Sequence, residues 1–262
     1  MMTIGRRLLL QGTLSTLVAV AAAHADPIFR HAGRPAIGCC LCGGIAGERF
    51  RGLIRAVPGG LDITRSSGDA ETDKFLGAGL ARLATTFKVS PGFAFFEDGD
   101  TPNAFATADD ILKEGAGTVL MGKRLFARHM ADDKDGGMSI MAICAHEFAH
   151  IHQMATGLEA RLKVLDSTAK PVELHADFLA GYFLSLRKRD HAELDLSAIG
   201  RVFYNLGDNA FKSRRHHGTS EERVTAITAG FAFGKTDAPT IGAASKAGLL
   251  YLIGNGGRTA LR

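Results

Sequence analysis

The stretch SIMAICAHEFAHIHQMA, residues 139–155, decides which fold and which chemistry the rest of the chain must accommodate. Ser139 can cap a helix that runs over 140–155. Residues four apart lie on one face of a helix, so His146 and His150 can direct two imidazole rings at one point. Two converging imidazoles are what a tetrahedral zinc ion needs from its first two ligands.

The residue that follows the first histidine fits the same site. Glu147 lies about 100° round the helix from His146, so its carboxylate reaches beside a metal ion rather than onto it. That is the position of a general base that acts on water. Cys144 lies about 200° round the helix from His146. We interpret it as a packed core thiol rather than a ligand, because it lies on the face opposite His146 and the other residues of 140–151, apart from the two histidines and Glu147, are apolar or small.

A third ligand is expected from another helix, and residues 173–177, Glu-Leu-His-Ala-Asp, offer one. Glu173 and Asp177 lie one turn apart on the same face. Asp177 can therefore accept the spare N–H of a ligating histidine while Glu173 binds the metal. His175 is the alternative ligand, because a third histidine is equally good chemistry, but it points away from that face. We expect Glu173 to be the ligand.

The remaining pattern indicates one α+β domain over 69–235, in which a small, mostly antiparallel sheet packs against the histidine helix and a second, Glu-bearing helix. Leu76, Leu80, Leu83 and Phe87 form the apolar stripe of an earlier helix. The predicted strands are 93–96, 103–107 and 118–121, and the further predicted helices are 123–130, 171–189, 192–205 and 221–229. Residues 236–262 are expected to form a C-terminal tail.

Residues 1–25 have the pattern of an export signal. Arg6 and Arg7 precede a short apolar run, and Ala23-His24-Ala25 supplies a small-x-small cleavage site, so the mature chain is expected to begin at Asp26. The paired arginines favour the twin-arginine route. The apolar run is too short to span a bilayer stably, so we expect an exported protein, periplasmic or secreted, without a membrane span after signal removal.

Residues 26–68 are expected to form an arm or linker that carries Cys39, Cys40 and Cys42. In an oxidising compartment, a local disulfide between Cys39 and Cys42 is the simplest interpretation. A second metal site built on the three thiols is one alternative. Another is a latent state in which one of these thiolates occupies the active-site zinc before processing. The sequence does not decide between them.

Composition excludes some classes of function. With 46% hydrophobic and 22% charged residues, the chain resembles globular proteins rather than disordered ones. The formal net charge of +4 includes the two arginines of the signal, and no basic run is interleaved with aromatic residues. Nucleic acid is therefore not expected as a partner. The oligomeric state is not indicated.

Taken together, His146-Glu147-x-x-His150 and Glu173-x-x-x-Asp177 resemble the gluzincin zinc metallopeptidases. The closer likeness is to the family that contains the HtpX-like proteases and the CAAX endopeptidases, as a soluble exported member. In that family an Asn-Ala-Phe-Ala strand precedes the zinc helix, and Asn103, Ala104, Phe105 and Ala106 match it. A later histidine followed by arginine six residues on is matched by His217 and Arg223. The likeness covers roughly residues 69–233.

The resemblance implies a zinc-dependent endopeptidase that binds one Zn²⁺ per chain and cleaves a polypeptide substrate with Glu147 as the general base. It implies that strand 103–107 could hold the substrate in an extended form, and that His217 stabilises the oxyanion, with His216 as the alternative donor. Arg223 would position the loop around the substrate. The family's Gly-rich turn after this strand is replaced here by polar residues within 108–114, which leaves substrate choice open.

Two other classes of function remain open at this point. One is a metal-dependent hydrolase of non-protein substrates, such as an amide or a cell-wall cross-link, which would use the same metal site. The other is a binding or chaperone-like protein that keeps a zincin fold without turnover. Loss of the base would be the sequence signature of the second class, and Glu147 is present.

Overall fold

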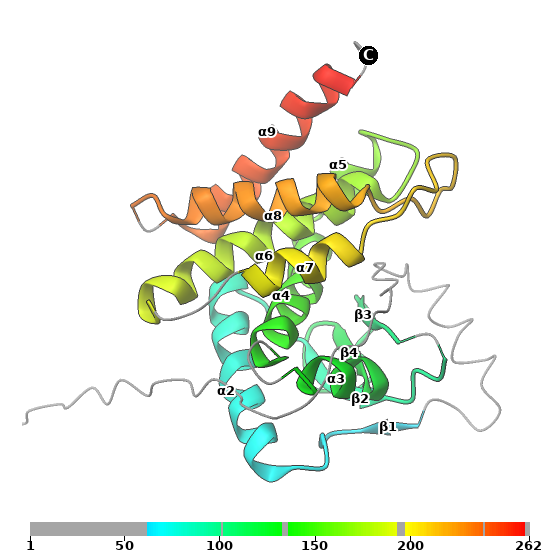
Figure 1. Cartoon of the computed structure of the whole chain (residues 1–262), viewed down its shortest axis with the longest axis vertical. Coiled ribbons are helices and arrows are strands. Elements are labelled where there is room, and N and C mark those ends of the chain that lie inside the picture. Colours follow the sequence, from blue (N-terminus) through cyan, green and yellow to red (C-terminus); the bar gives the residue numbers. More distant parts are fainter. Residues whose placement is uncertain (1–61, 101, 133–135, 193–196, 238, 260–262) are drawn as a thin grey trace, which may run out of the picture.

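The computed structural model describes residues 62–100, 102–132, 136–192, 197–237 and 239–259. The export signal and the cysteine cluster predicted before residue 62 lie outside the described residues. The strands are β1 (Ile63–Thr64), β2 (Gly92–Phe96), β3 (Ala104–Thr107) and β4 (Thr118–Gly122). The helices are α2 (Ala70–Phe87), α3 (Lys123–Met130), α4 (Gly136–Ala155), α5 (Leu158–Lys163), α6 (Lys170–Asp190), α7 (Ser197–Asn205), α8 (Ser220–Gly234) and α9 (Ile241–Thr259). Among the described residues, the elements form a mixed α+β fold (Figure 1).

Helix α4, which carries the two histidines, begins earlier than the sequence predicts. It starts at Gly136, and Ser139 is a buried residue of its first turn rather than its cap. The amide of Gly136 donates to the carbonyl of Asp132. A Cβ at Gly136 would lie 2.4 Å from the carbonyl oxygen of His129. The lack of a side chain lets α4 start directly against the end of α3, so the cap expected at Ser139 is wrong.

Helix α6, which carries Glu173, agrees with its predicted range of 171–189 to within one residue at each end. Pro171 lies in its first turn, where a missing N–H costs no hydrogen bond, and Arg187, Lys188 and Arg189 fill its last turn. Helix α8 packs directly on α6. A Cβ at Gly181 would lie 2.0 Å from the carbonyl oxygen of Ile227, so the two backbones touch with no side chain between them. This close approach brings the first turn of α8 to the end of α6 that carries Glu173 and Asp177.

The four-stranded sheet has the order β1-β2-β4-β3 and is mixed, with two antiparallel strand pairs, as expected for a mostly antiparallel sheet, and one parallel pair that the sequence did not predict. Strands β1 and β2 are antiparallel, as are β3 and β4, but β2 and β4 run parallel from the pair Gly92–Thr118 to the pair Phe96–Gly122. After β2 the chain crosses to the far edge, forms β3 there, and returns as β4 between them. Strand β4 is buried along its whole length, as a central strand must be.

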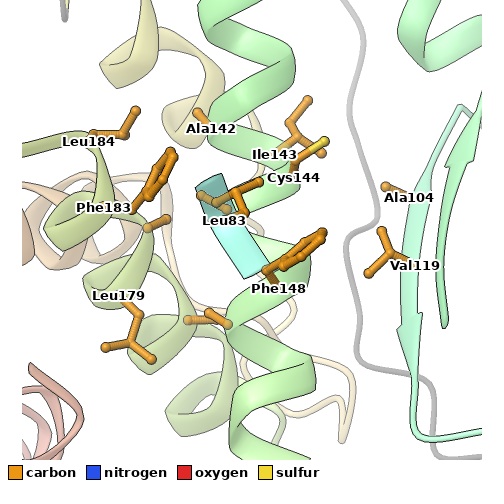
Figure 2. Packing of buried hydrophobic residues seen from close by; sticks show 14 of the residues in the cluster. Leu83, Ala104, Val119, Ala142, Ile143, Cys144, Phe148, Leu179, Phe183 and Leu184 are labelled. Carbon is orange, nitrogen blue, oxygen red and sulfur yellow. The ribbon is translucent and has the colours of Figure 1, made fainter. Parts of the chain in front are cut away.

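The main hydrophobic core surrounds α4. Figure 2 shows Phe148 of α4 between Val119 of the sheet and Phe183 of α6, with Leu83 of α2 alongside. Each fully buried side chain of this size stabilises the fold by about 1.5–3 kcal/mol relative to the exposed state. Cys144 belongs to the same cluster and is fully buried, as predicted for a core thiol, and burial raises the pKa of its thiol.

The C-terminal segment is not a simple tail. Within 236–262 the structure contains α9, whose residues Ile241 and Ala244 join the main core. Leu249 and Leu252 pack against a small cluster built from α5 and the start of α6. The last turns of α9 extend away from the other helices (Figure 1). Among the described helices, none is long and apolar enough to cross a membrane.

Candidate metal centre

The structure brings together the three predicted ligands. His146 and His150 lie one turn apart on α4, and Glu173 comes from the first turn of the neighbouring α6. The His146 Nε2 and His150 Nε2 atoms are 3.0 Å apart. Glu173 Oε2 lies 3.3 Å from His146 Nε2, and Glu173 Oε1 lies 3.6 Å from His150 Nε2. At most 2% of each side chain is exposed.

These separations fit a zinc ion. Ligand atoms about 2.0–2.1 Å from a tetrahedral zinc lie roughly 3.3 Å from one another. The three separations found here, 3.0, 3.3 and 3.6 Å, straddle that value. Two imidazoles and one carboxylate are also a donor set that zinc prefers, with a fourth position left for water or substrate. Among the described residues, this is the group of histidine, cysteine and acidic side chains whose ligand atoms lie within 4.8 Å of one another.

The charges of the site also match a divalent cation. Glu147, Glu173 and Asp177 are fully or almost fully buried carboxylates, and Arg223 is the buried cation beside them. Their formal charges leave an excess of two negative charges inside the protein. Burying uncompensated charge is costly, so a bound dication would stabilise the arrangement. The charge of the protein groups therefore agrees with the geometry of the ligand atoms.

The pKa values of these groups reflect the same charge imbalance. Burial lowers the pKa of His146, but its contacts with Asp177 and Glu173 outweigh burial and raise that pKa to about 9. Burial raises the pKa of Glu173, yet the neighbouring His150 and His146 hold it well below its ordinary value. A metal ion bound by these residues would have to displace a proton, so its affinity would depend on pH.

Glu147 has the environment expected of a general base. Both of its carboxylate oxygens are buried and have no hydrogen-bond partner among the described residues. Burial raises the pKa of its carboxyl, against the opposing influence of His146 and His150. A buried carboxylate without partners costs free energy, and such groups are concentrated at functional sites. Glu147 is placed beside the ligands with its proton-accepting capacity unused.

Asp177 lies beside His146, on the side of the ring away from the other candidate ligands. Its Oδ1 is 2.8 Å from His146 Nδ1, which leaves Nε2 directed at the metal position. Arg223 of α8 donates two hydrogen bonds to the same carboxylate, one from Nε and one from a terminal nitrogen, and each is 2.7 Å long. The other terminal nitrogen of Arg223 donates to the carbonyl of Leu206. Arg223 is fully buried, so its described contacts support Asp177 and the end of α7.

His175, the alternative ligand, has other partners. It is fully buried on α6, but its Nδ1 lies 3.1 Å from Gln153 Nε2 and its Nε2 lies 3.0 Å from the carbonyl oxygen of Ser245. Both ring nitrogens are therefore engaged away from the ligand cluster. The geometry favours Glu173, as the sequence predicted.

The loop between α7 and α8 carries His216 and His217. Asp208 organises it, because Oδ1 lies 2.7 Å from His216 Nδ1 and Oδ2 accepts the main-chain N–H of His217. Burial lowers the pKa of His217, and the charges of Glu173 and His146 also influence it. The charges that act on the pKa of His217 therefore include those of two candidate ligands. The Nε2 atom of His216 is buried and has no hydrogen-bond partner among the described residues.

Strand β3, the predicted substrate strand, is the outer strand of the described sheet next to β4, and it packs against α4. Asn103 Oδ1 accepts the N–H of Ala104, and Asn103 also accepts the N–H of Gly122 through its main-chain oxygen. Ala104 and Phe105 are buried. Their role in substrate binding stays a prediction.

No family model matches the chain, and no curated protein or solved structure matches it either.

The sequence pattern did not single out Gln153, whose Oε1 lies 2.9 Å from Nδ1 of the candidate ligand His150. The signal was present in the spacing, because Gln153 lies three residues after His150 on the same helix face. The contact of α9 with His175 is made by the main-chain carbonyl of Ser245, so no side-chain pattern in the sequence indicates it.

Proposed function

We propose that this chain is a zinc-dependent endopeptidase of the gluzincin type, similar to the HtpX-like and CAAX-endopeptidase-like family and exported from the cytoplasm. The observation that carries the proposal is the buried cluster of His146, His150 and Glu173 with the unpartnered carboxylate of Glu147 beside it. A purely structural zinc site has four protein ligands and needs no free base. Here the described protein ligands number three, and a base adjoins them.

The chain's own residues would divide the reaction between them. Zinc held by the three ligands would polarise the peptide carbonyl and make water more acidic. Glu147 accepts a proton as the water oxygen adds to the carbonyl carbon. Glu147 then returns that proton to the amine nitrogen as the carbon–nitrogen bond breaks, which leaves a carboxylic acid and an amine. Asp177 keeps His146 oriented throughout.

Two further roles belong to the proposal. The His217 ring would donate an N–H to the oxygen that gains negative charge at the carbonyl. The charges of Glu173 and His146 act on the pKa of His217, and this supports that role. Strand β3 would pair with an extended polypeptide through its outer edge, since it is the outer strand and packs against the ligand-bearing helix.

The decisive experiment uses the mature chain from Asp26, loaded with one equivalent of zinc. An unstructured protein and a preparation of cell-wall cross-links are offered as substrates, with and without a chelator. We expect cleavage of the protein, loss of cleavage with chelator and recovery on adding zinc. Hydrolysis of the cell-wall material alone would indicate a non-protein hydrolase. Tight zinc binding without turnover of either would indicate a binding or chaperone-like protein.

A further inference from the structure

A continuous line of hydrogen-bonding groups leads from the ligand His150 to the backbone of α9. His150 Nδ1 lies 2.9 Å from Gln153 Oε1. Gln153 Nε2 lies 3.1 Å from His175 Nδ1, and His175 Nε2 lies 3.0 Å from the carbonyl oxygen of Ser245. The first three side chains are at most 2% exposed, so water does not compete for these contacts. Three helices, α4, α6 and α9, contribute to the line.

The direction of each hydrogen bond follows from the end of the line. A carbonyl oxygen only accepts, so His175 must donate from Nε2 to Ser245, and neutral His175 then accepts at Nδ1. Gln153 Nε2 also lies 2.9 Å from the carbonyl oxygen of Val172, which identifies that atom as the donating amide nitrogen. Gln153 Oε1 consequently faces His150 and accepts its Nδ1–H. That leaves His150 Nε2 as a bare lone pair.

We propose that Gln153 and His175 are positioning residues that hold His150 in its metal-binding tautomer, so that the docking of α9 contributes to metal affinity. The inference rests on the proposed metal site, and it adds that metal affinity there depends on the packing of α9. His146 obtains the same orientation from a carboxylate, Asp177, whereas His150 obtains it from a neutral relay. The two ligands of one helix are thus supported by different chemistry.

Helix α9 packs closely against the relay, the line of side chains formed by Gln153 and His175. A Cβ at Gly248 would lie 2.9 Å from Cδ2 and 3.0 Å from Nε2 of the His175 ring. Because that ring is buried, it has little room to move, and a side chain at Gly248 would push α9 away from it. The hydroxyl of Ser245 serves a separate branch, since its Oγ lies 2.9 Å from Nε2 of His152. His152 bonds in turn to the carbonyl of Phe87 and not to a ligand.

The first test replaces the acceptor for His150. Zinc affinity of the full mature chain is measured by competition with a chromophoric chelator, and the cobalt-substituted protein is examined by visible absorption. We expect Gln153→Leu to weaken zinc binding by about 10-fold or more and to alter the cobalt spectrum. Gln153→Glu keeps an acceptor opposite His150 Nδ1–H but cannot donate to the carbonyl of Val172 or to His175 Nδ1, so its zinc affinity should lie between those of Gln153→Leu and the wild type.

The second test moves α9 without changing any group in contact with a ligand, which covers the case in which Gln153→Leu does not fold. We expect Gly248→Ala to weaken zinc binding by about threefold or more, and the matched variant Ser245→Ala, which spares the main-chain carbonyl, to change it by less than about twofold. Thermal unfolding of the metal-free variants measures any loss of fold separately.

Three results would overturn the relay. They are unchanged affinity in Gln153→Leu, a loss in Gln153→Glu as large as in Gln153→Leu, and equal losses in Gly248→Ala and Ser245→Ala. In each case the wild type would still bind one zinc that Glu173→Ala loses. If instead Glu173→Ala binds zinc like the wild type, the metal site itself fails, and that failure is distinguishable from failure of the relay.

Discussion

The two faces of α4 are buried to the same degree, but they are stabilised in opposite ways. Cys144 and Phe148 face the apolar core and are 0% and 2% exposed, and His146 and His150 on the other face are 0% and 2% exposed. Burial of the apolar face is favourable in itself. Burial of the polar face is unfavourable until each group has a partner. The two faces are therefore equally buried but differ in energy. Burial of the apolar face stabilises the fold, whereas the polar groups of the other face need hydrogen-bond or charge partners from the rest of the fold.

The partners of the polar face come from three other helices, α6, α8 and α9, and from Gln153 of α4 itself. Asp177 of α6 and Arg223 of α8 support His146, and Gln153 with the α9 backbone supports His150. The apolar face needs only shape, which α2, α6 and the sheet supply together. Substitutions on the two faces should accordingly separate loss of chemistry from loss of stability.

The largest effect is expected from removing a ligand. Glu173→Ala should reduce bound zinc from one per chain to almost none, because two imidazoles alone hold zinc weakly. His175→Ala, two residues further along the same buried helix, should retain most of the metal when zinc is in excess. Elemental analysis after gel filtration checks both. The reverse result would make His175 the ligand and end the gluzincin assignment.

The next effect concerns the base. Glu147→Gln conserves shape but loses basicity, so zinc content and unfolding temperature should stay near those of the wild type. Peptide cleavage should fall by about 10²–10⁴-fold, the usual contribution of a general base. Turnover measured under zinc saturation provides the test. A near wild-type rate would indicate a different base or a different reaction.

The local grouping of the polar face, with Asp177 among its supports, was predictable, whereas the parallel strand pair and the docking of α9 were not, for a physical reason. The spacing within 146–150 and within 173–177 is local to single helices, so the period of the α-helix predicts which side chains share a face, and the structure brings His146, His150 and Glu173 together. Whether β2 pairs with β4 in parallel depends on where the chain crosses, which no local period encodes. The docking of α9 through Gly248 and a main-chain carbonyl likewise leaves no pattern of side chains to recognise.

The apolar face should respond in the opposite manner. Phe148→Ala removes a 2%-exposed ring from the core and should lower the free energy of unfolding by about 3–5 kcal/mol. Molecules that remain folded should still bind one zinc and cleave substrate at near the wild-type rate. Urea denaturation and activity per folded molecule measure the two quantities. A large loss of turnover without loss of stability would show that the two faces are not separable.

The smallest of these effects, and the sharpest test of the polar side, concerns His217, which lies outside α4. Asp208 accepts the main-chain N–H of His217 through Oδ2, which fixes the backbone but leaves the ring available, whereas the ring of His216 is already held by Oδ1 of the same carboxylate. The charges of Glu173 and His146 also act on the pKa of His217. Removal of one oxyanion donor costs on the order of 10²–10³ in kcat. His217→Ala should therefore slow turnover by that order with zinc retained and KM little changed, because the interaction forms only as charge develops.

His216→Ala is the matched control, since it alters the same loop at the neighbouring residue. A loss below about fivefold in His217→Ala is too small for an oxyanion donor, and a larger effect from His216→Ala would transfer the role to that residue.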